Sequence, residues 1–262
     1  MADEASAVLD RLRPTLGAAG FDLAVPLLAG WYNDEPHIAP LPDAHKLPAP
    51  PSALAVLVGN SRALWSPFMD WVGERLDRDP KWAETHADPL DEYTQEVINR
   101  ALAAPGVPAA HVVYAYETLE THGRAVSVTT AAHVSGLAFY HAELQRSIHA
   151  TLGPWIAYRA ILIFDSITPQ CLRHPDPPAD PCAPPTWTRV GDLQRECFSK
   201  WGAEPDEVSW ARLVEIARAF EMDEFAYDEE QIQFHYAPSA EARSARLADC
   251  AARRAAARSA VI

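Results

Sequence analysis

The 262-residue sequence lacks a long hydrophobic run, and its longest apolar stretches are Ala53–Val58 and Ala160–Phe164. A helix needs about 20 apolar residues to cross a bilayer, so neither stretch predicts a membrane span. The acidic beginning, Met1–Ser6, also lacks the basic region and apolar core of a signal peptide. We therefore expect a soluble, cytoplasmic protein with no membrane partner.

Positive charge is scarce as well. The sequence has 22 Lys and Arg against 36 Asp and Glu, a formal net charge of −14. Proteins that bind nucleic acid gain affinity from clustered Lys and Arg, so this composition disfavours a nucleic-acid partner. The exception is residues 242–262, with five Arg and one Asp. Alanines interrupt these arginines and no aromatic residue accompanies them, so we expect a helix that packs on the acidic body.

Common catalytic and metal motifs are also missing. The four cysteines form no CxxC pair, which favours free thiols in a reducing compartment over a zinc or redox motif. The sequence contains no GxGxxG, phosphate-binding P-loop, GxSxG or HExxH motif. The usual nucleotide, hydrolase and zinc-protease sites are therefore not predicted.

Proline, in contrast, is abundant and clustered. Residues 36–51 and 169–185 hold 13 of the 23 prolines. Proline lacks a backbone donor and disfavours helix in the residue before it, so we expect neither stretch to form a helix or a central strand. Connections of this length are usually functional or disordered.

Apolar periodicity predicts the remaining elements. We predict strands at 21–28, 53–58 and 155–164, a hairpin of 111–119 with 124–129, and a helix from Thr130 through His141. The other predicted helices are 8–16, 64–76, 90–102, 189–200, 206–220, 224–234 and a tail at about 239–262. This order predicts one α+β domain over residues 1–262, with a mixed or antiparallel sheet flanked by helices.

Polar and aromatic residues are densest at 111–159. On the predicted helix, His133, Tyr140 and His141 would share one face and could contact a large flat ligand. A non-haem metal site of His133, His141 and Glu143 is an alternative, although their spacing is not specific for a metal. Arg159 lies in an apolar strand, where its charge needs either a buried ion pair or a role in holding an anion.

The order of several short segments is more specific than any single motif. The segments are Gly20–Asp22, Trp31–Asn33, Ala55–Phe68, Asp88–Asp91, Thr130–Gly136, Phe139–Tyr140, Ile148–His149, Gly153, Trp155, Ala157–Arg159 and Tyr227–Gln231. In this order, over residues 18–243, they resemble the CblC family of cobalamin-processing proteins (MMACHC-type).

The resemblance implies a sandwich fold related to flavin-dependent nitroreductases and flavin reductases. It implies a protein that binds cobalamin with the benzimidazole tail detached from cobalt and removes the upper ligand. Cyanide would leave reductively with reduced FMN or FAD, and alkyl groups would pass to glutathione or another small thiol. A flavin reductase or a cobalamin-trafficking protein is the implied partner, and we expect a monomer or homodimer.

Carried over position by position, the resemblance also implies site residues. The contacts to the corrinoid and its tail fall on Val126, Ser127, Val128, Thr129, His133, Tyr140, His141, Ala142, Ser147, Trp155 and Tyr158. Arg159 corresponds to an arginine that holds the thiol, and Arg243 matches another. His133 and Arg159 are the residues that the resemblance assigns to catalysis, with no metal beyond the cobalt of cobalamin.

Two other functions remain open from the sequence. The first is a flavin- or metal-dependent oxidoreductase on the same fold that uses His133, His141 and Glu143. The second is a corrinoid carrier that binds its cargo without changing it.

Overall fold

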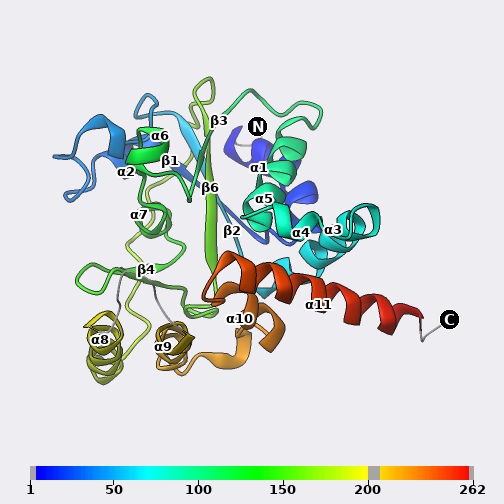
Figure 1. Cartoon of the computed structure of the whole chain (residues 1–262). Helices are drawn as coiled ribbons and strands as arrows, with labels where there is room; N and C mark the ends of the chain where they lie inside the picture. Colours follow the sequence, from blue (N-terminus) through cyan, green and yellow to red (C-terminus); the bar gives the residue numbers. More distant parts are fainter. Residues whose placement is uncertain (1–3, 200–206, 260–262) are drawn as a thin grey trace. The chain divides into compact units, whose positions relative to one another are not determined.

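The computed structural model (Figure 1) describes residues 4–199 and 207–259. The chain divides into two compact units. The first unit contains the chain up to Ser61 together with residues 94–150 and 156–181. The second contains residues 62–93, 151–155 and the chain from Cys182 onward. The single domain over 1–262 stays a prediction.

A four-stranded antiparallel sheet forms the centre of the first unit, with strand order β1-β2-β6-β3 (Figure 1). Its strands are β1 (Leu23–Leu28), β2 (Leu54–Asn60), β6 (Ala157–Phe164) and β3 (His111–Tyr114). Every residue of β2 is buried, as its continuous apolar sequence predicts for a central strand. Pro26 lies in β1 at the edge of the sheet, where a missing backbone donor is tolerated.

The other elements of the first unit surround this sheet. A second sheet pairs β4 (Phe139–His141) with β5 (Arg146–Ile148). The helices are α1 (Glu4–Ala18), α2 (Ala29–Asn33), α6 (Leu119–His122), α7 (Val128–Val134) and most of α5 (Pro89–Leu102). The α+β prediction with a helix-flanked antiparallel sheet is confirmed.

Helices make up the second unit. They are α3 (Trp65–Arg78), α4 (Trp82–Thr85), α8 (Pro184–Ser199), α9 (Glu207–Arg218), α10 (Glu229–His235) and α11 (Ala240–Ser259). Short 3-10 turns form at Asp43–His45 in the first unit and at Arg62–Leu64 and Asp223–Phe225 in the second. The helical character predicted for the C-terminal part is confirmed, although the predicted ends at 200, 206 and 262 lie outside the described residues. None of the described helices is long and apolar enough to cross a membrane.

The predicted hairpin of 111–119 with 124–129 is wrong. Only β3 forms, and it pairs with β6. The hydroxyl of Thr118 accepts a hydrogen bond from the backbone of Thr121, which caps the short helix α6, and Gly123 ends that helix with a φ of 68°. Helix α6 thus ends the first expected strand early, and the second is replaced by an irregular segment at 124–127 that leads into α7, which begins at Val128.

The predicted helix from Thr130 through His141 is also too long. Helix α7 ends at Val134, and Gly136 then adopts a φ of 77°. Glycine takes this left-handed conformation without strain, which makes it a common helix terminator. The chain then continues as strand β4, so Tyr140 and His141 do not share a helix face with His133.

The second proline stretch ends earlier than predicted, because helix α8 begins at Pro184. The first turn of a helix tolerates proline, since its backbone N–H groups have no partner within the helix. Upstream of this helix, His174 packs its ring against Trp31 at 4.7 Å between centroids. The Pro175 side chain lies close to Gly136. This part of the stretch is therefore packed against the first unit.

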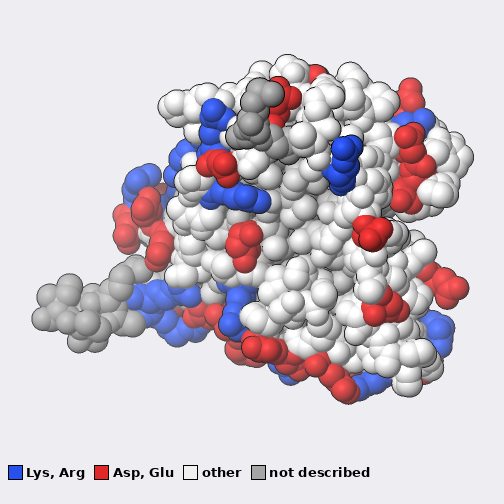
Figure 2. Space-filling view, turned by 180° about the vertical axis from the view of Figure 1, so that it is seen from behind, with Lys and Arg blue, Asp and Glu red and all other residues white. Residues whose placement is uncertain are grey.

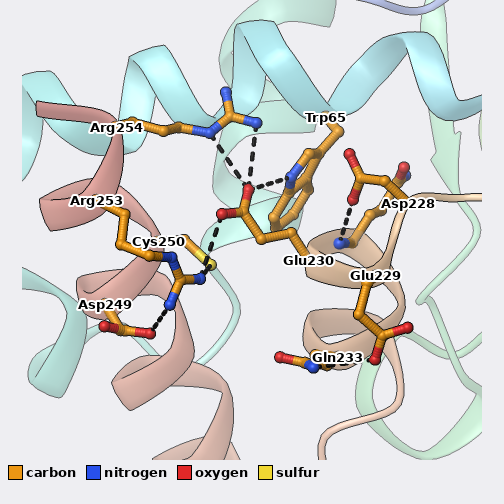
Figure 3. Close-up of polar contacts among 10 residues, drawn as sticks. Trp65, Asp228, Glu229, Glu230, Gln233, Asp249, Cys250, Arg253 and Arg254 are labelled. Atoms are coloured by element: carbon orange, nitrogen blue, oxygen red, sulfur yellow. Dashed lines mark hydrogen bonds and ion pairs between the residues drawn. The ribbon is translucent and has the colours of Figure 1, made fainter. Parts of the chain in front are cut away.

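The basic C-terminal helix packs on α3, α4 and α10 within the second unit, and Glu230 accepts hydrogen bonds from two of its arginines (Figure 3). The carboxylate of Glu230, on α10, accepts hydrogen bonds from Arg253 and Arg254 of α11 at 3.3 Å. Trp65 of α3 donates to the same carboxylate at 3.1 Å. The prediction that the basic tail packs on the acidic body is thus confirmed for the described part of α11. Figure 2 shows other Lys and Arg side chains lying among Asp and Glu on the face it presents.

Candidate functional site

Most of the predicted contact residues gather in the first unit, where helix α7 contacts β4, β5 and β6. Val126 precedes α7, and Ser127 caps the helix. The helix carries Val128, Thr129 and His133, and the strands supply the others. All of these side chains are half-buried: Val126, Ser127, Val128, Thr129, His133, Tyr140, His141, Ser147 and Tyr158. Half-buried side chains can pack on the core and still present atoms to a ligand.

His133 has an unusual environment in this group. Its Nδ1 atom is buried and has no hydrogen-bond partner among the described residues. Its ring meets Phe139 edge-on at 6.3 Å between centroids, and Phe139 meets His141 in the same way at 6.4 Å. A buried polar atom without a partner costs free energy, so Nδ1 is a candidate to bond with a polar group of a ligand.

Tyr158 and Ser147 form a polar pair at the strand side of the group. Their hydroxyl oxygens lie 2.8 Å apart. Burial raises the pKa of Tyr158 well above its usual value of 10, with a smaller opposing effect from the Ser147 hydrogen bond. Tyr158 therefore stays neutral at physiological pH and acts through its hydroxyl group and its ring.

Arg159 lies at a β-bulge in β6. On β2, Val58 pairs with Ala160 and the next residue, Gly59, pairs with Tyr158, so Arg159 is the extra residue of the bulge. Bulges redirect side chains and are frequent beside functional sites. A side chain at Gly59 would come within 2.7 Å of a backbone oxygen of β6, so the close approach at the bulge requires glycine.

Asn60 orients the Arg159 guanidinium. This asparagine is the last residue of β2 and is fully buried. Its Oδ1 accepts a hydrogen bond from Arg159 Nε at 2.7 Å, and its Nδ2 donates to the backbone oxygen of Ser61 at 2.9 Å. The amide is a neutral partner, so this bond fixes the direction of the guanidinium without neutralising its charge.

Ala142 and Glu143 are exposed residues in the turn between β4 and β5. The alternative metal site required Glu143 to join His133 and His141. Among residues 4–199 and 207–259, however, no three His, Cys, Asp or Glu side chains come together in a way that could hold a metal ion. Because His133 is on a helix and the other two follow on the β4–β5 ribbon, the described chain does not assemble this site.

Trp155 and Arg243 belong to the second unit. Trp155 is 1% exposed and packs in a cluster with Tyr227 and Ile232, so its side chain serves the core of that unit. Arg243, on α11, donates to Asp88 Oδ1 at 3.4 Å. It borders a cavity of about 120 Å³ beside the start of α5. The ligand contacts predicted for these two residues stay predictions.

Several residues near the site were not predicted from the sequence. The Nε2 atom of His37 lies 2.9 Å from the hydroxyl oxygen of Thr130. The His37 ring stacks on Tyr140, with 6.1 Å between the ring centroids. Tyr32 and Asn60 are buried in the same unit. The only sequence feature that could have pointed to them is their location, because Tyr32 precedes a proline stretch and Asn60 ends a buried strand. The sequence does not indicate their hydrogen-bond partners, which lie 95 and 99 residues away.

The sequence matches a model of one protein family over more than half of its length. The model described as MMACHC, the methylmalonic aciduria and homocystinuria type C family, matches residues 20–201. The chain belongs to this family. It is therefore an MMACHC-family cobalamin-processing protein, and the resemblance seen in the order of its short segments is confirmed.

Individual proteins agree with this assignment. The chain is 29% identical over 188 residues to a cyanocobalamin reductase / alkylcobalamin dealkylase of Danio rerio, covering 66% of this chain and 70% of that protein. It is 26% identical over 187 residues to the protein of the same name in Gallus gallus, covering 65% and 72%.

A solved structure shows the fold. The crystal structure of the C. elegans B12-trafficking protein CblC, a homologue of human MMACHC, matches with a TM-score of 0.75 at 16% identity. The match covers 93% of this chain and 95% of that chain. The predicted nitroreductase-like α+β fold is therefore confirmed.

Proposed function

We propose that this protein binds cobalamin with its benzimidazole tail detached and removes the upper axial ligand. Family membership and the names of its relatives support the substrate class. The observation that carries the proposal here is the gathering of half-buried polar and aromatic side chains around α7, β4, β5 and β6. A corrinoid needs apolar and aromatic walls with a few placed polar groups, which this group offers.

In this proposal, His133 provides the central polar contact. Its buried Nδ1 would bond with an amide group of the corrinoid or its tail, which would offset the cost of leaving that atom unpaired. The Ser147–Tyr158 pair and the Thr129 hydroxyl would supply further hydrogen bonds. Val126 and Val128 pack on the apolar core of the first unit and would provide an apolar surface against which the ligand rests.

For alkylcobalamins, we propose transfer of the alkyl group to a thiol. The thiolate sulfur forms a bond with the alkyl carbon while the cobalt–carbon bond breaks, and both electrons of that bond stay on cobalt. Arg159, oriented by Asn60, would hold the carboxylate of the thiol substrate near that carbon. Arg243 is the second candidate for holding the thiol.

For cyanocobalamin, we propose reduction of the cobalt by a reduced flavin, with cyanide as the leaving group. Detaching the axial base makes this reduction easier, and excluding water protects the product. No described side chain is assigned here to the flavin, which is proposed as a soluble electron donor. A flavin reductase that regenerates it, or a protein that accepts the processed cobalamin, is the proposed partner.

The test is an absorption spectrum of methylcobalamin or cyanocobalamin with excess protein. The proposal expects a shift to the base-off form, followed by conversion to a reduced product when glutathione or reduced flavin is added. An unchanged spectrum at saturating protein would contradict binding. A base-off shift without any product, with either reagent, would instead support a carrier that does not process its cargo.

A further inference from the structure

The first proline stretch, residues 36–51, is tied to the chain segment that begins the candidate site. The backbone N–H of Ala125 donates to the backbone oxygen of Ala44 at 2.9 Å. The Nδ1 of His45 lies 3.0 Å from the backbone oxygen of Ala125. A carbonyl oxygen only accepts hydrogen bonds, so His45 carries its hydrogen on Nδ1. Ala44 and His45, which are adjacent in the proline stretch, thus bond with the backbone N–H and the backbone oxygen of Ala125.

Tyr32 lies at this junction and is fully buried. Its hydroxyl accepts a hydrogen bond from the backbone N–H of Ser127 at 2.9 Å and donates one to the backbone oxygen of His45 at 3.0 Å. Burial raises the pKa of Tyr32 to about 12, with a smaller opposing effect from the Ser127 bond, so the hydroxyl keeps its proton at physiological pH. One buried hydroxyl therefore links the proline stretch to the start of helix α7.

The Ser127 end of this link controls several predicted contacts. The Ser127 hydroxyl caps α7 by accepting from the backbone N–H of Thr130 at 3.2 Å, and it lies 3.1 Å from the Thr129 hydroxyl. A displacement of Ser127 would therefore shift the first turn of α7. That turn leads to His133, whose buried Nδ1 is the proposed polar contact.

The proline stretch is itself firmly held. Asn33 bonds with both polar backbone groups of Leu47, accepting at 2.8 Å and donating at 3.1 Å. Leu47 is 2% exposed and belongs to the core of the first unit, together with Ile38. The stretch is thus held in place by the core of the first unit. Because Ala125 bonds with this stretch, the stretch fixes the location of the Ala125 backbone.

We propose that Tyr32 and His45 are positioning residues for cobalamin, which hold the peptide segment 125–127 where its contacts can meet the corrinoid. This inference rests on the proposed function, since it assigns a role within the same site. Neither residue is proposed to touch the ligand. Their effect passes through the Ser127 and Ala125 backbone.

The first test removes one hydroxyl. Tyr32→Phe leaves the backbone N–H of Ser127 without its partner while keeping the ring in the core. We expect cobalamin affinity to fall about tenfold, which corresponds to about 1.4 kcal/mol. Amide exchange of residues 125–130, measured without cobalamin, should become faster. Tyr93→Phe is the matched control, because Tyr93 is also buried, at 3% exposed, but belongs to the second unit.

The second test uses His45, in case Tyr32→Phe fails to fold. An asparagine side chain can place its amide nitrogen close to where histidine has Nδ1, so His45→Asn keeps a donor for Ala125 and His45→Ala removes it. We expect His45→Asn to bind cobalamin nearly as the unmodified protein does, and His45→Ala to bind several-fold more weakly. All affinities are measured at a temperature where circular dichroism shows the variants folded.

The outcomes separate this inference from the proposed function. Weaker binding and faster exchange in Tyr32→Phe and His45→Ala, with both controls unchanged, would support positioning. Equal binding by the unmodified protein and these variants, or unchanged exchange at 125–130, would overturn it. Failure of the unmodified protein to take cobalamin base-off would overturn the proposed function, and the cobalamin role of Tyr32 and His45 with it.

Discussion

His133 combines two properties that rarely occur together at one side chain. It is half-buried, and its Nδ1 has no partner in the described chain. Natural proteins pair nearly all buried polar atoms, so an exception at a position predicted to bind a ligand has chemical meaning. If the proposed function holds, the corrinoid or its tail would supply the missing bond at this atom.

Replacing His133 by alanine should therefore weaken cobalamin binding. One hydrogen bond contributes about 0.5–1.5 kcal/mol, so we expect an affinity loss of about 2- to 12-fold. Spectroscopic titration with cyanocobalamin measures it. His122→Ala, an exposed histidine on α6, is the control and should bind normally. Equal affinities for both variants would remove His133 from the site.

Arg159 should separate binding from chemistry. Arg159 is proposed to hold the thiol, so Arg159→Ala should leave the base-off shift intact. It should lower the rate of glutathione-dependent dealkylation by about tenfold or more, because one charge-assisted hydrogen bond contributes about 1.5–3 kcal/mol. Single-turnover conversion of methylcobalamin measures the rate. Arg100→Ala, an exposed arginine at the end of α5, is the control. A variant with full dealkylation rate would refute the assignment.

At the scale of elements, Glu230 is one of several residues that attach helix α11. Between Ala240 and Ala256, Leu247, Cys250 and Ala251 are the buried apolar residues of this helix, which is a small apolar face. The carboxylate of Glu230 adds bonds from Arg253, Arg254 and Trp65 (Figure 3). Partial burial alone would raise the pKa of Glu230, but these donors together lower it.

We expect Glu230→Gln to loosen α11. Partly exposed ion pairs contribute about 0.5–1 kcal/mol, so amide exchange in α11 should become about two- to fivefold faster. Glu229→Gln is the matched control, because Glu229 bonds only with Gln233 on its own helix among the contacts described (Figure 3).

The pH dependence of stability gives a second check of the role of Glu230. A lowered carboxyl pKa stabilises the folded state above its usual value of 4.5 and loses this effect as the pH falls through the lowered pKa. The difference in urea stability between Glu230→Gln and the unmodified protein should therefore disappear in acid.

The end of α7 provides another element-scale prediction. Gly136 has a φ of 77°, and a Cβ atom there would lie 3.0 Å from the Pro175 side chain. Gly136→Ala should destabilise folding by about 1–2 kcal/mol from the left-handed conformation alone. Gly17→Ala is the control, because it lies inside α1 with open space around it and should be neutral or stabilising. Urea unfolding of both variants gives the comparison, and equal stability would contradict the strain at Gly136.

Local signals decided which elements were predictable. The buried run at 54–60 and the amphipathic helices were recognisable because their periodicity involves the strand or helix itself. The region 115–141 was mistaken for two reasons. Thr118 and Ser127 cap short helices where the pattern favoured a hairpin, and Gly136 follows the end of α7 where the pattern favoured a longer helix. The contacts predicted on α7 came from the resemblance and stay predictions. Tyr32 and Asn60 were missed, since their partners lie 95 and 99 residues away in the sequence.

At the scale of the whole molecule, ligand binding should stabilise the folded state. A ligand at 100 times its dissociation constant adds about 2.7 kcal/mol if it binds only the folded protein. For a chain of this size, each kcal/mol corresponds to about 2–4 °C in melting temperature. We therefore expect cobalamin to raise the melting temperature by about 5–10 °C, as measured by calorimetry. The His133→Ala variant should show a smaller rise, and an unchanged melting temperature for the unmodified protein would argue against binding.

The bulge at Arg159 has a consequence for how this sequence can vary. It divides β6 into two parts with different registers against β2. The part from Ala160 to Phe164 is fully buried, while Ala157 and Tyr158 are half-buried beside the candidate site. A change in the site part can be absorbed at the bulge without shifting the core part. We therefore expect substitutions at Ala157 and Tyr158 to disturb the fold less than substitutions from Ala160 to Phe164.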